Sequence, residues 1–393
     1  MTDKPQFDGQ CVKLGDVATY INGYAFKPAD YSLNGKQIIR IQDLTGNAYQ
    51  TNNFAGELDD KYLVSSGDVL ISWSASLGVF EWNKEEAWLN QHIFKVVFNK
   101  LPVDKRYFIH QARYVINRGA MLAHGATMRH LTKKVFESLP FSYPNRSEQL
   151  TIAKRLDDIQ RQIYLAEKQI SKLDSLVKSR FIEMFGDPIR NPLRMSVSSV
   201  EELAAPIKNS MKAGPFGSAL KKEVYAESGY KVYGQEQVIS GNQFLGNYYI
   251  DKEKYEQLNS CKVMPGDVLI SLVGTVGKVL ILSEDCQPGI INPRLVKITF
   301  DKRKIFPEYF AIAFSLESVR SSLLGRAHGQ TMNVLNLGMI KKLKLPVPPI
   351  SRQKEYLNFV AQVDKSRFGG MLRLLNSLSG IMHASFFSVA DTD

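Results

Sequence analysis

The six residues GDVLIS at positions 67–72 occur again, letter for letter, at positions 266–271. Two identical hexapeptides this far apart are improbable by chance in a chain of 393 residues. In each copy Gly-Asp, a turn pair, precedes an apolar stretch, which predicts a tight turn that leads into a buried strand. The repetition indicates that the chain holds two versions of one structural unit.

The correspondence continues downstream of both hexapeptides in the same order. The matching pairs are WSASLGVFEW (73–82) with LVGTVGKVLI (272–281), LNQHIFKVVF (89–98) with INPRLVKITF (291–300), AHGATMRHL (123–131) with AHGQTMNVL (327–335), and SLPFSYPNRSEQ (138–149) with KLPVPPISRQ (344–353). The offset between copies drifts only slightly, so small loop insertions separate them. Because this period is far longer than a solenoid repeat, each copy is predicted to be a domain with its own core.

Each copy is predicted to be an α+β domain of mixed, mostly β structure. HIFKVVF and LVKITF alternate as strands do, and helical patterns follow at about residues 104–121 and 307–324. Two such duplicated domains, separated by a pair of long antiparallel coiled-coil helices, are the fold that we expect. The predicted boundaries are 1–146 and 189–346 for the domains, and 147–188 and 347–393 for the helices.

The long helices are predicted from an apolar seam that follows each domain. Apolar residues recur from Ile152 in alternating steps of four and three, at Leu156, Ile159, Ile163, Ala166, Ile170, Leu173 and Val177. The second copy, from about 352 to 387, keeps this phase more weakly, because Asp364 and Arg367 interrupt it. The simplest way to bury both seams is against each other. Dimerisation between molecules through the first helix alone is the alternative.

Composition and charge limit the class of protein and its partners. The chain is 44% hydrophobic and 23% charged, as globular proteins are, and its net charge of +11 favours a polyanionic partner. The N-terminal MTDKPQFDGQ lacks the features of a secretory signal, and no apolar stretch is long enough to span a bilayer. We therefore expect a cytoplasmic protein that does not enter the membrane.

No motif for catalysis or metal binding is apparent in the sequence. Three scattered cysteines without a CxxC pair, and six histidines without an HExxH spacing, argue against a disulfide framework or a metal site. GTVGK (274–278) lacks the first glycine of a phosphate-binding loop. NPLR (191–194) and NPRL (292–295) lack the second proline and the aromatic residue of an adenine-methylation motif. The chain is expected to be catalytically silent by itself.

Together these features resemble the DNA-specificity subunits of type I restriction-modification systems. The resemblance rests on the repeated GDVLIS with its following glycine, the Asn-Gln or Asn-Pro strand entries, the HGxTM loops, the LP…P…Q hinges and the long helices, in one order, twice. In that family each domain is a target recognition domain that reads one half of a split double-stranded DNA site. The helices act as a spacer of fixed length.

The resemblance also implies partners and a cofactor. Two methyltransferase subunits would bind the chain and restriction subunits would join them. S-adenosylmethionine would be held by the methyltransferase, which methylates adenine N6, while this chain would hold no cofactor and no metal. Two alternatives remain at this point: a coiled-coil adaptor without sequence-specific DNA binding, and a chain that is itself the enzyme.

Residues that contact DNA bases are expected where the two copies differ. All three tryptophans lie in the first copy, where Trp73 could approach DNA and core packing is expected for Trp82 and Trp88. In the HGxTM loops Arg129 faces Asn333 beside the shared Thr127 and Thr331. Arg suits guanine and Asn suits adenine, although the loop could equally be a structural closure.

Further candidates follow the strands that precede each hexapeptide. In IIRIQDL the polar residues Arg40 and Gln42, and in VYGQEQV the residues Tyr233, Gln235 and Gln237, alternate along an apparent strand and its exit. We predict that they contact bases or phosphates. The candidate phosphate contacts are Lys27, Lys212, Lys278 and Arg294.

Overall fold

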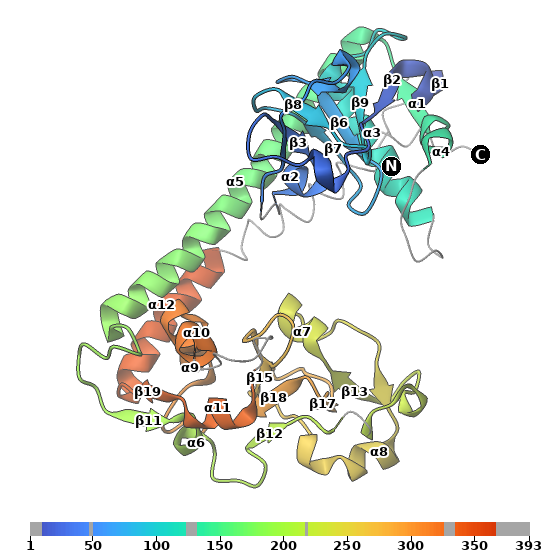
Figure 1. The fold of residues 1–393 in the computed structure, drawn as a ribbon. Helices are drawn as coiled ribbons and strands as arrows, with labels where there is room; N and C mark the ends of the chain where they lie inside the picture. Colours follow the sequence, from blue (N-terminus) through green and yellow to red (C-terminus); the bar gives the residue numbers. More distant parts are fainter. Residues whose placement is uncertain (1–9, 47–49, 123–131, 217–218, 326–334, 367–393) are drawn as a thin grey trace. The chain divides into compact units, whose positions relative to one another are not determined.

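The computed structural model of the chain describes residues 10–46, 50–122, 132–216, 219–325 and 335–366 (Figure 1). These residues fall into two compact units. The first runs through Glu167 and the second starts at Lys168. Each is a mixed α+β unit, and the two repeat one arrangement of strands, as the duplicated sequence predicts.

A four-stranded antiparallel sheet built around the hexapeptide strand forms the centre of each unit. In the first unit its order is β2 (Thr19–Asn22), β9 (Ile93–Val97), β6 (Val69–Ser72) and β7 (Gly78–Glu81). In the second unit the order is β12 (Met211–Ala213), β18 (Leu295–Ile298), β15 (Val268–Ser271) and β16 (Val279–Ile281). All four residues of both β6 and β15 are buried, so the hexapeptide supplies the core strand that the sequence predicts.

A second sheet in each unit contains one parallel pair. In the first unit its order is β4 (Asn53–Phe54), β3 (Lys36–Ile39), β8 (Ala87–Leu89) and β5 (Leu63–Val64), and β3 pairs with β8 in parallel. In the second unit the order is β14 (Tyr249–Ile250), β13 (Tyr230–Tyr233) and β17 (Gly289–Ile291), and β13 pairs with β17 in parallel. A short helix follows β3 and β13: α2 (Ile41–Thr45) and α7 (Gln235–Ser240).

The remaining elements close each unit beside its long helix. Two ribbons, β1 (Gln10–Lys13) with β10 (Pro140–Tyr143) and β11 (Val197–Ser199) with β19 (Lys344–Pro346), occupy matching places. The predicted helices are confirmed as α3 (Lys105–Leu122) and, in the second unit, α9 (Pro307–Ser315) and α10 (Glu317–Leu324). The second pattern is divided because Leu316 is extended between the two helices.

The Gly-Asp pair of the hexapeptide forms the same turn in both units. Gly67 and Gly266 have φ angles of +92° and +83°, a left-handed conformation that glycine adopts without steric cost. Asp68 Oδ2 accepts the backbone N–H of Ser65 at 2.8 Å, and Asp267 Oδ2 accepts that of Met264 at 2.9 Å. The aspartate therefore holds the turn that leads into the core strand.

The same aspartate also joins two strands of the sheet. Asp68 pairs with Lys95 at 3.0 Å, and Asp267 pairs with Lys297 at 3.4 Å. The second pair is almost completely buried, and the hydroxyl of Thr299 also donates to Asp267. Buried charges of this kind are tolerated only when they are paired and hydrogen-bonded, so this contact explains why the aspartate recurs in both copies.

The serine that ends the hexapeptide shapes the next turn. Ser72 Oγ donates to the carbonyl of Ser76, and Ser271 Oγ donates to the carbonyl of Thr275. Both serines are completely buried. Their hydroxyls stabilise the turn between β6 and β7 in the first unit and the turn between β15 and β16 in the second. Every residue of GDVLIS thus has a structural role, which confirms the predicted turn and buried strand.

The long helix α5 (Arg146–Phe185) contains 40 residues, and its predicted seam is confirmed. All eight seam positions from Ile152 to Val177 are buried or half-buried, whereas most of the positions between them are exposed. The second long helix is described as α12 (Ile350–Ser366), and the rest of its predicted span lies outside the described residues.

In the second unit α12 runs alongside the end of α5 in the opposite direction, as predicted (Figure 1). Four aromatic residues fill the contact: Phe181 and Phe185 of α5, Tyr309 of α9 and Tyr356 of α12, with ring centroids 5.1–5.5 Å apart. The Tyr356 hydroxyl donates to the carbonyl of Val177 at 2.9 Å. This hydrogen bond and the aromatic packing hold the two helices together within the unit.

A buried glutamine attaches each long helix to its domain. Gln149 Oε1 accepts the N–H of Asp104 at 2.8 Å, while its Nε2 donates to the carbonyl of Pro144 at 2.8 Å. Gln353 Oε1 accepts the N–H of Phe306 at 3.0 Å, and its Nε2 donates to Lys304 and Pro348 at 3.0 and 2.8 Å. The matching glutamine at the end of each LP…P…Q motif is therefore a clamp between loop and helix.

Candidate nucleic-acid interface

Three segments of the first unit surround a pocket of about 510 Å³ beside the hexapeptide strand. They are the start of α2, the turn between β6 and β7, and the segment between β8 and β9. The lining residues are Arg40, Ile41, Gln42, Thr45, Ser74, Ala75, Ser76, Asn90, His92 and Ile93. Most of them lie on loops or at element ends held by rigid sheets, which is where binding residues concentrate. We call these three segments the first cluster.

At the α2 side of the first cluster, the side chain of Arg40 is held by contacts with nearby residues of the same segment. Arg40 is partly buried, and its guanidinium donates to the carbonyl of Gln50 and lies 3.6 Å from Asp43. With the Gln42 amide turned so that its oxygen faces the guanidinium, Arg40 also donates to it at 3.0 and 3.1 Å. The structure thus brings Arg40 and Gln42 together, and Gln42 is the more exposed of the two.

Trp73 lies in the turn between β6 and β7, and His92 lies in the segment between β8 and β9. Trp73 is half-buried, stacks on Phe94 with ring centroids 5.8 Å apart, and donates its indole N–H to Asn22 at 3.3 Å. Its ring lies 5.5 Å from that of His92. Trp82 and Trp88 are only 3% and 4% exposed, which confirms that they belong to the core.

The second unit gathers the corresponding three segments, which we call the second cluster. Gln235, at the start of α7, donates its amide to the carbonyl of Val273 in the turn between β15 and β16. Its oxygen accepts a hydrogen bond from Arg294 Nη1 at 3.4 Å, and Arg294 lies between β17 and β18. The side chain of Lys278, at the end of the same turn, is exposed. Gln235 and Arg294 are 59 residues apart in the sequence, and the fold unites them.

Both clusters share a framework and differ in the polar side chains that they present. The tip of the turn is left-handed in both, with φ of +56° at Ala75 and +65° at Gly274. Glycines approach the third segment closely: a Cβ on Gly23 would lie 2.1 Å from the carbonyl oxygen of Asn90, and one on Gly214 would lie 1.8 Å from that of Asn292. The framework therefore demands glycine where the backbones meet.

Two of the predicted contacts, Tyr233 and Gln237, are buried. The Tyr233 hydroxyl donates to the carbonyl of Gln287 at 2.7 Å, and burial raises the pKa of this tyrosine. The Gln237 amide accepts the N–H of Gly234 at 2.7 Å and donates to the carbonyl of Leu245 at 2.6 Å. Both side chains are engaged with the backbone of the unit.

The predicted strand exit is a short helix in both units. We expected Gln235 and Gln237 to alternate along extended backbone. Instead they occupy the first turn of α7, because the Gln237 side chain caps the N–H of Gly234 and closes that turn. Side chains that are two positions apart on a helix point in different directions. Gln235 therefore faces the second cluster, while Gln237 enters the core.

Of the other predicted residues, Lys27 and Lys212 lie on other elements than the two clusters. Lys27 is exposed and precedes the 3₁₀ turn Pro28–Asp30, and Lys212 is half-buried on β12, opposite Lys297. Thr127, Arg129, Thr331 and Asn333 lie outside the described residues. Contacts of these residues with DNA stay predictions.

Sequence reasoning missed His92 and the turn residues Ser74 to Ser76. A signal for His92 was present, since the aligned segments place it opposite Arg294 and next to the shared Asn90 and Asn292. The turn residues gave no such signal, because their position beside α2 depends on the parallel pairing of β3 with β8.

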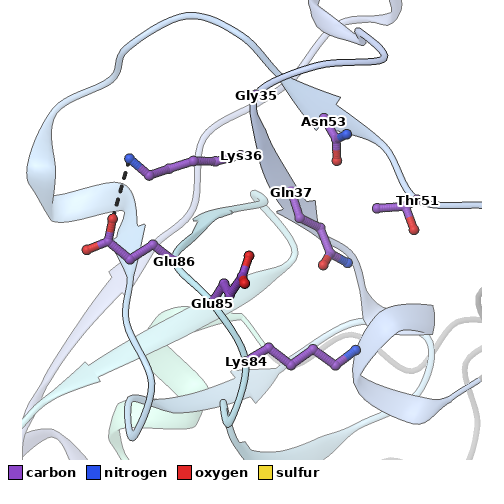
Figure 2. Close-up of a pocket in the computed structure, with 8 residues that line it drawn as sticks. All are labelled: Gly35, Lys36, Gln37, Thr51, Asn53, Lys84, Glu85 and Glu86. Atoms are coloured by element: carbon purple, nitrogen blue, oxygen red, sulfur yellow. Dashed lines mark ion pairs between the residues drawn. The ribbon is translucent and has the colours of Figure 1, made fainter.

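A second hollow of the first unit, of about 780 Å³, lies beside the start of β3, β4 and the loop that precedes β8 (Figure 2). It is lined by both signs of charge: Lys36 pairs with Glu86 at 3.4 Å, and Lys84 lies over the Trp82 ring at 5.5 Å. Glu85 adds a further carboxylate. The acidic groups make this hollow less suited to a phosphate backbone than the first cluster.

The described residues contain no group of three or more His, Cys, Asp or Glu side chains placed to hold a metal ion. Within the same part of the chain, none of the helices combines the length and the apolar character that crossing a bilayer requires.

Two duplicated α+β units, a long helix and paired polar clusters define a protein class with two recognition modules. Comparison with known proteins identifies the family. The family model described as "Type I restriction modification DNA specificity domain" matches residues 8–175 and 214–373. The chain therefore belongs to the family of type I restriction-modification DNA-specificity subunits. The predicted family and recognition role are confirmed.

Two curated relatives and one solved structure illustrate the match. The chain is 22% identical to the type I restriction enzyme EcoBI specificity subunit of Escherichia coli, over 95% of this chain and 85% of the relative. It is 22% identical to the MjaVIII specificity subunit of Methanocaldococcus jannaschii, over 91% and 86%. A structure titled "Structural basis underlying complex assembly and conformational transition of the type I R-M system" covers 99% of both chains, with 13% identity and a TM-score of 0.51. This likeness supports the fold.

Proposed function

We propose that the two units are target recognition domains, spanning residues 1–146 and 189–346, that each read one half of a split DNA site. The long helices, 147–188 and 347–393, would set the number of unspecified base pairs between the halves. The observation that carries this proposal is that the same three segments gather polar side chains in both units, while the side chains themselves differ. Two linked readers gain affinity because the first contact raises the effective concentration of the second.

The chain is proposed to be a non-catalytic platform in the cytoplasm. Its partners would be double-stranded DNA, two methyltransferase subunits and restriction subunits, and the methyltransferase would bring S-adenosylmethionine for transfer of a methyl group to adenine N6. The net charge of +11 supports a polyanionic partner, and the relatives' names support an assembly of the restriction type. Neither cluster contains a carboxylate or histidine arrangement that suggests a catalytic group.

The affinity of the assembly for DNA is expected to fall steeply as salt rises. Each phosphate that the protein neutralises contributes a slope of about −0.9 in a plot of log affinity against log salt. The measurement is fluorescence anisotropy of a labelled duplex with this chain and its methyltransferase subunits, between low and physiological salt. A coiled-coil adaptor without DNA contacts predicts a slope near that of the methyltransferase subunits alone.

The isolated chain serves as the control for the enzyme alternative. Calorimetric titration with S-adenosylmethionine should release no binding heat with the chain alone and should do so when the methyltransferase subunits are present. Tight binding of the cofactor by the isolated chain contradicts the platform role.

A further inference from the structure

Arg294 is the most precisely placed exposed cation of the second cluster. Its backbone N–H donates to Asn292 Oδ1 at 2.9 Å, which fixes the main chain at this position. Its guanidinium is exposed and donates through Nη1 to Gln235 Oε1 at 3.4 Å. No other hydrogen bond of this side chain occurs among the described residues, and a guanidinium carries five N–H donors.

Gln235 connects this guanidinium to the backbone of the scaffold. Its amide nitrogen donates to the Val273 carbonyl, and its amide oxygen accepts from Arg294. The Val273 carbonyl belongs to the turn that the hydroxyl of Ser271 supports. Two successive hydrogen bonds therefore connect the turn after the buried strand through Gln235 to Arg294 and restrict the position of the guanidinium.

Neutralising a phosphate does not require a guanidinium that is held in one orientation. A phosphate can be neutralised by a flexible lysine, whereas guanine is recognised by two parallel N–H donors directed at O6 and N7. Phosphate contacts carry no sequence information, so two domains on one framework could share them. Arg294 is not shared: His92 occupies its place in the first cluster, and Ile41 occupies the place of Gln235.

We propose that Arg294, positioned by Gln235, reads a guanine through the major groove in the half-site of the second unit. This assignment rests on the proposed function and replaces the phosphate contact predicted for Arg294 from the sequence. The first cluster, with His92 and an apolar Ile41, lacks the hydrogen-bond chain. It must therefore read its half-site by other groups.

The test compares variants in the complete methyltransferase complex by mapping modified adenines genome-wide. In the natural protein the half-site of the second unit should contain an essential G·C pair. Arg294→Ala should accept other base pairs at that position alone and should lower affinity for the cognate duplex roughly 10- to 100-fold. Arg294→Lys should behave similarly, because lysine keeps the charge but loses the paired donors.

Two further variants separate base reading from other roles. Gln235→Met keeps the side-chain length and removes both hydrogen bonds; it should reduce discrimination at the same base pair while leaving affinity for random duplex unchanged. Lys278→Ala removes the candidate phosphate contact of the neighbouring turn; it should weaken binding to all duplexes alike and leave base preference at every position intact.

The outcomes distinguish the inference from the function on which it rests. If Arg294→Ala weakens binding equally for all sequences and reduces the salt slope by about one, Arg294 is a phosphate contact and the inference is wrong. A split motif that lacks a G·C pair in this half, or keeps it unchanged in Arg294→Ala, also overturns the inference while the proposed function stands. A natural complex without any split motif overturns both.

Discussion

Replacing Asp267 with alanine is expected to lower the free energy of unfolding of the second unit by about 3–5 kcal/mol. Asp267 is completely buried and Lys297, its partner at 3.4 Å, is 4% exposed. The substitution leaves the ammonium of Lys297 buried without its counter-charge. It also removes the acceptor for the Thr299 hydroxyl and for the Met264 N–H.

The distribution of tryptophans allows the two units to be followed separately in the full chain. Trp73, Trp82 and Trp88 all lie in the first unit, so denaturant unfolding monitored by tryptophan fluorescence reports that unit, whereas circular dichroism reports both. Asp267→Ala should shift the dichroism transition of the second unit and leave the fluorescence midpoint in place. An unchanged dichroism profile would mean that this ion pair contributes nothing to the fold.

Asp68→Ala is the matched control in the first unit. Its pair with Lys95 has side chains that are 27% and 18% exposed, so water partly compensates for the lost carboxylate. The shift in the fluorescence midpoint should therefore be smaller than the shift that Asp267→Ala produces in the second unit. Equal shifts would contradict the role of burial.

Replacing Gln353 with alanine is expected to cost the second unit at least about 2 kcal/mol. The completely buried amide makes three hydrogen bonds, to the N–H of Phe306 and to the carbonyls of Lys304 and Pro348. Alanine fills none of these roles and leaves the backbone groups unpaired in a largely dry site. The same denaturant experiment, read by circular dichroism, measures the loss.

Gln149→Ala tests whether the matching glutamine of the first unit also holds its long helix to its domain. It should shift the tryptophan fluorescence transition in the same direction, because Gln149 makes the equivalent contacts to Asp104 and Pro144. The exposed Gln160 on α5 is the control, and Gln160→Ala should stay within about 0.5 kcal/mol of the natural protein. A Gln353→Ala effect no larger than this control excludes a clamp.

Much of the fold could be predicted because duplication converts sequence identity into structural information. The glycine of GDVLIS indicates a turn and VLI a core strand, and the structure agrees. The partner of the aspartate could not be predicted. Lys297 lies thirty residues away, and only the register of β15 with β18, which places Leu269 opposite Lys297, brings it close.

The candidate site could be predicted only in part for the same reason. The sequence indicates Arg40, Gln42 and Gln235 as polar residues near strand ends and Arg294 as a candidate phosphate contact, yet nothing local in the sequence pairs Gln235 with Arg294. VYGQEQV is predicted to be a strand and its exit, whereas in the structure the Gln237 side chain closes the first turn of α7. His92 went unnoticed because a single histidine carries little signal until its counterpart Arg294 has a role.

The central claim is that one chain reads two DNA sequences with two versions of one domain. It is tested most directly by mapping modified adenines genome-wide for the chain with its methyltransferase subunits. Residues 7–145 or 195–345 would each be exchanged in turn for the equivalent domain of another family member. We predict a split motif in which each exchange changes one half and leaves the other half and the spacing intact. A continuous motif, or a motif in which either exchange alters both halves, would contradict the account.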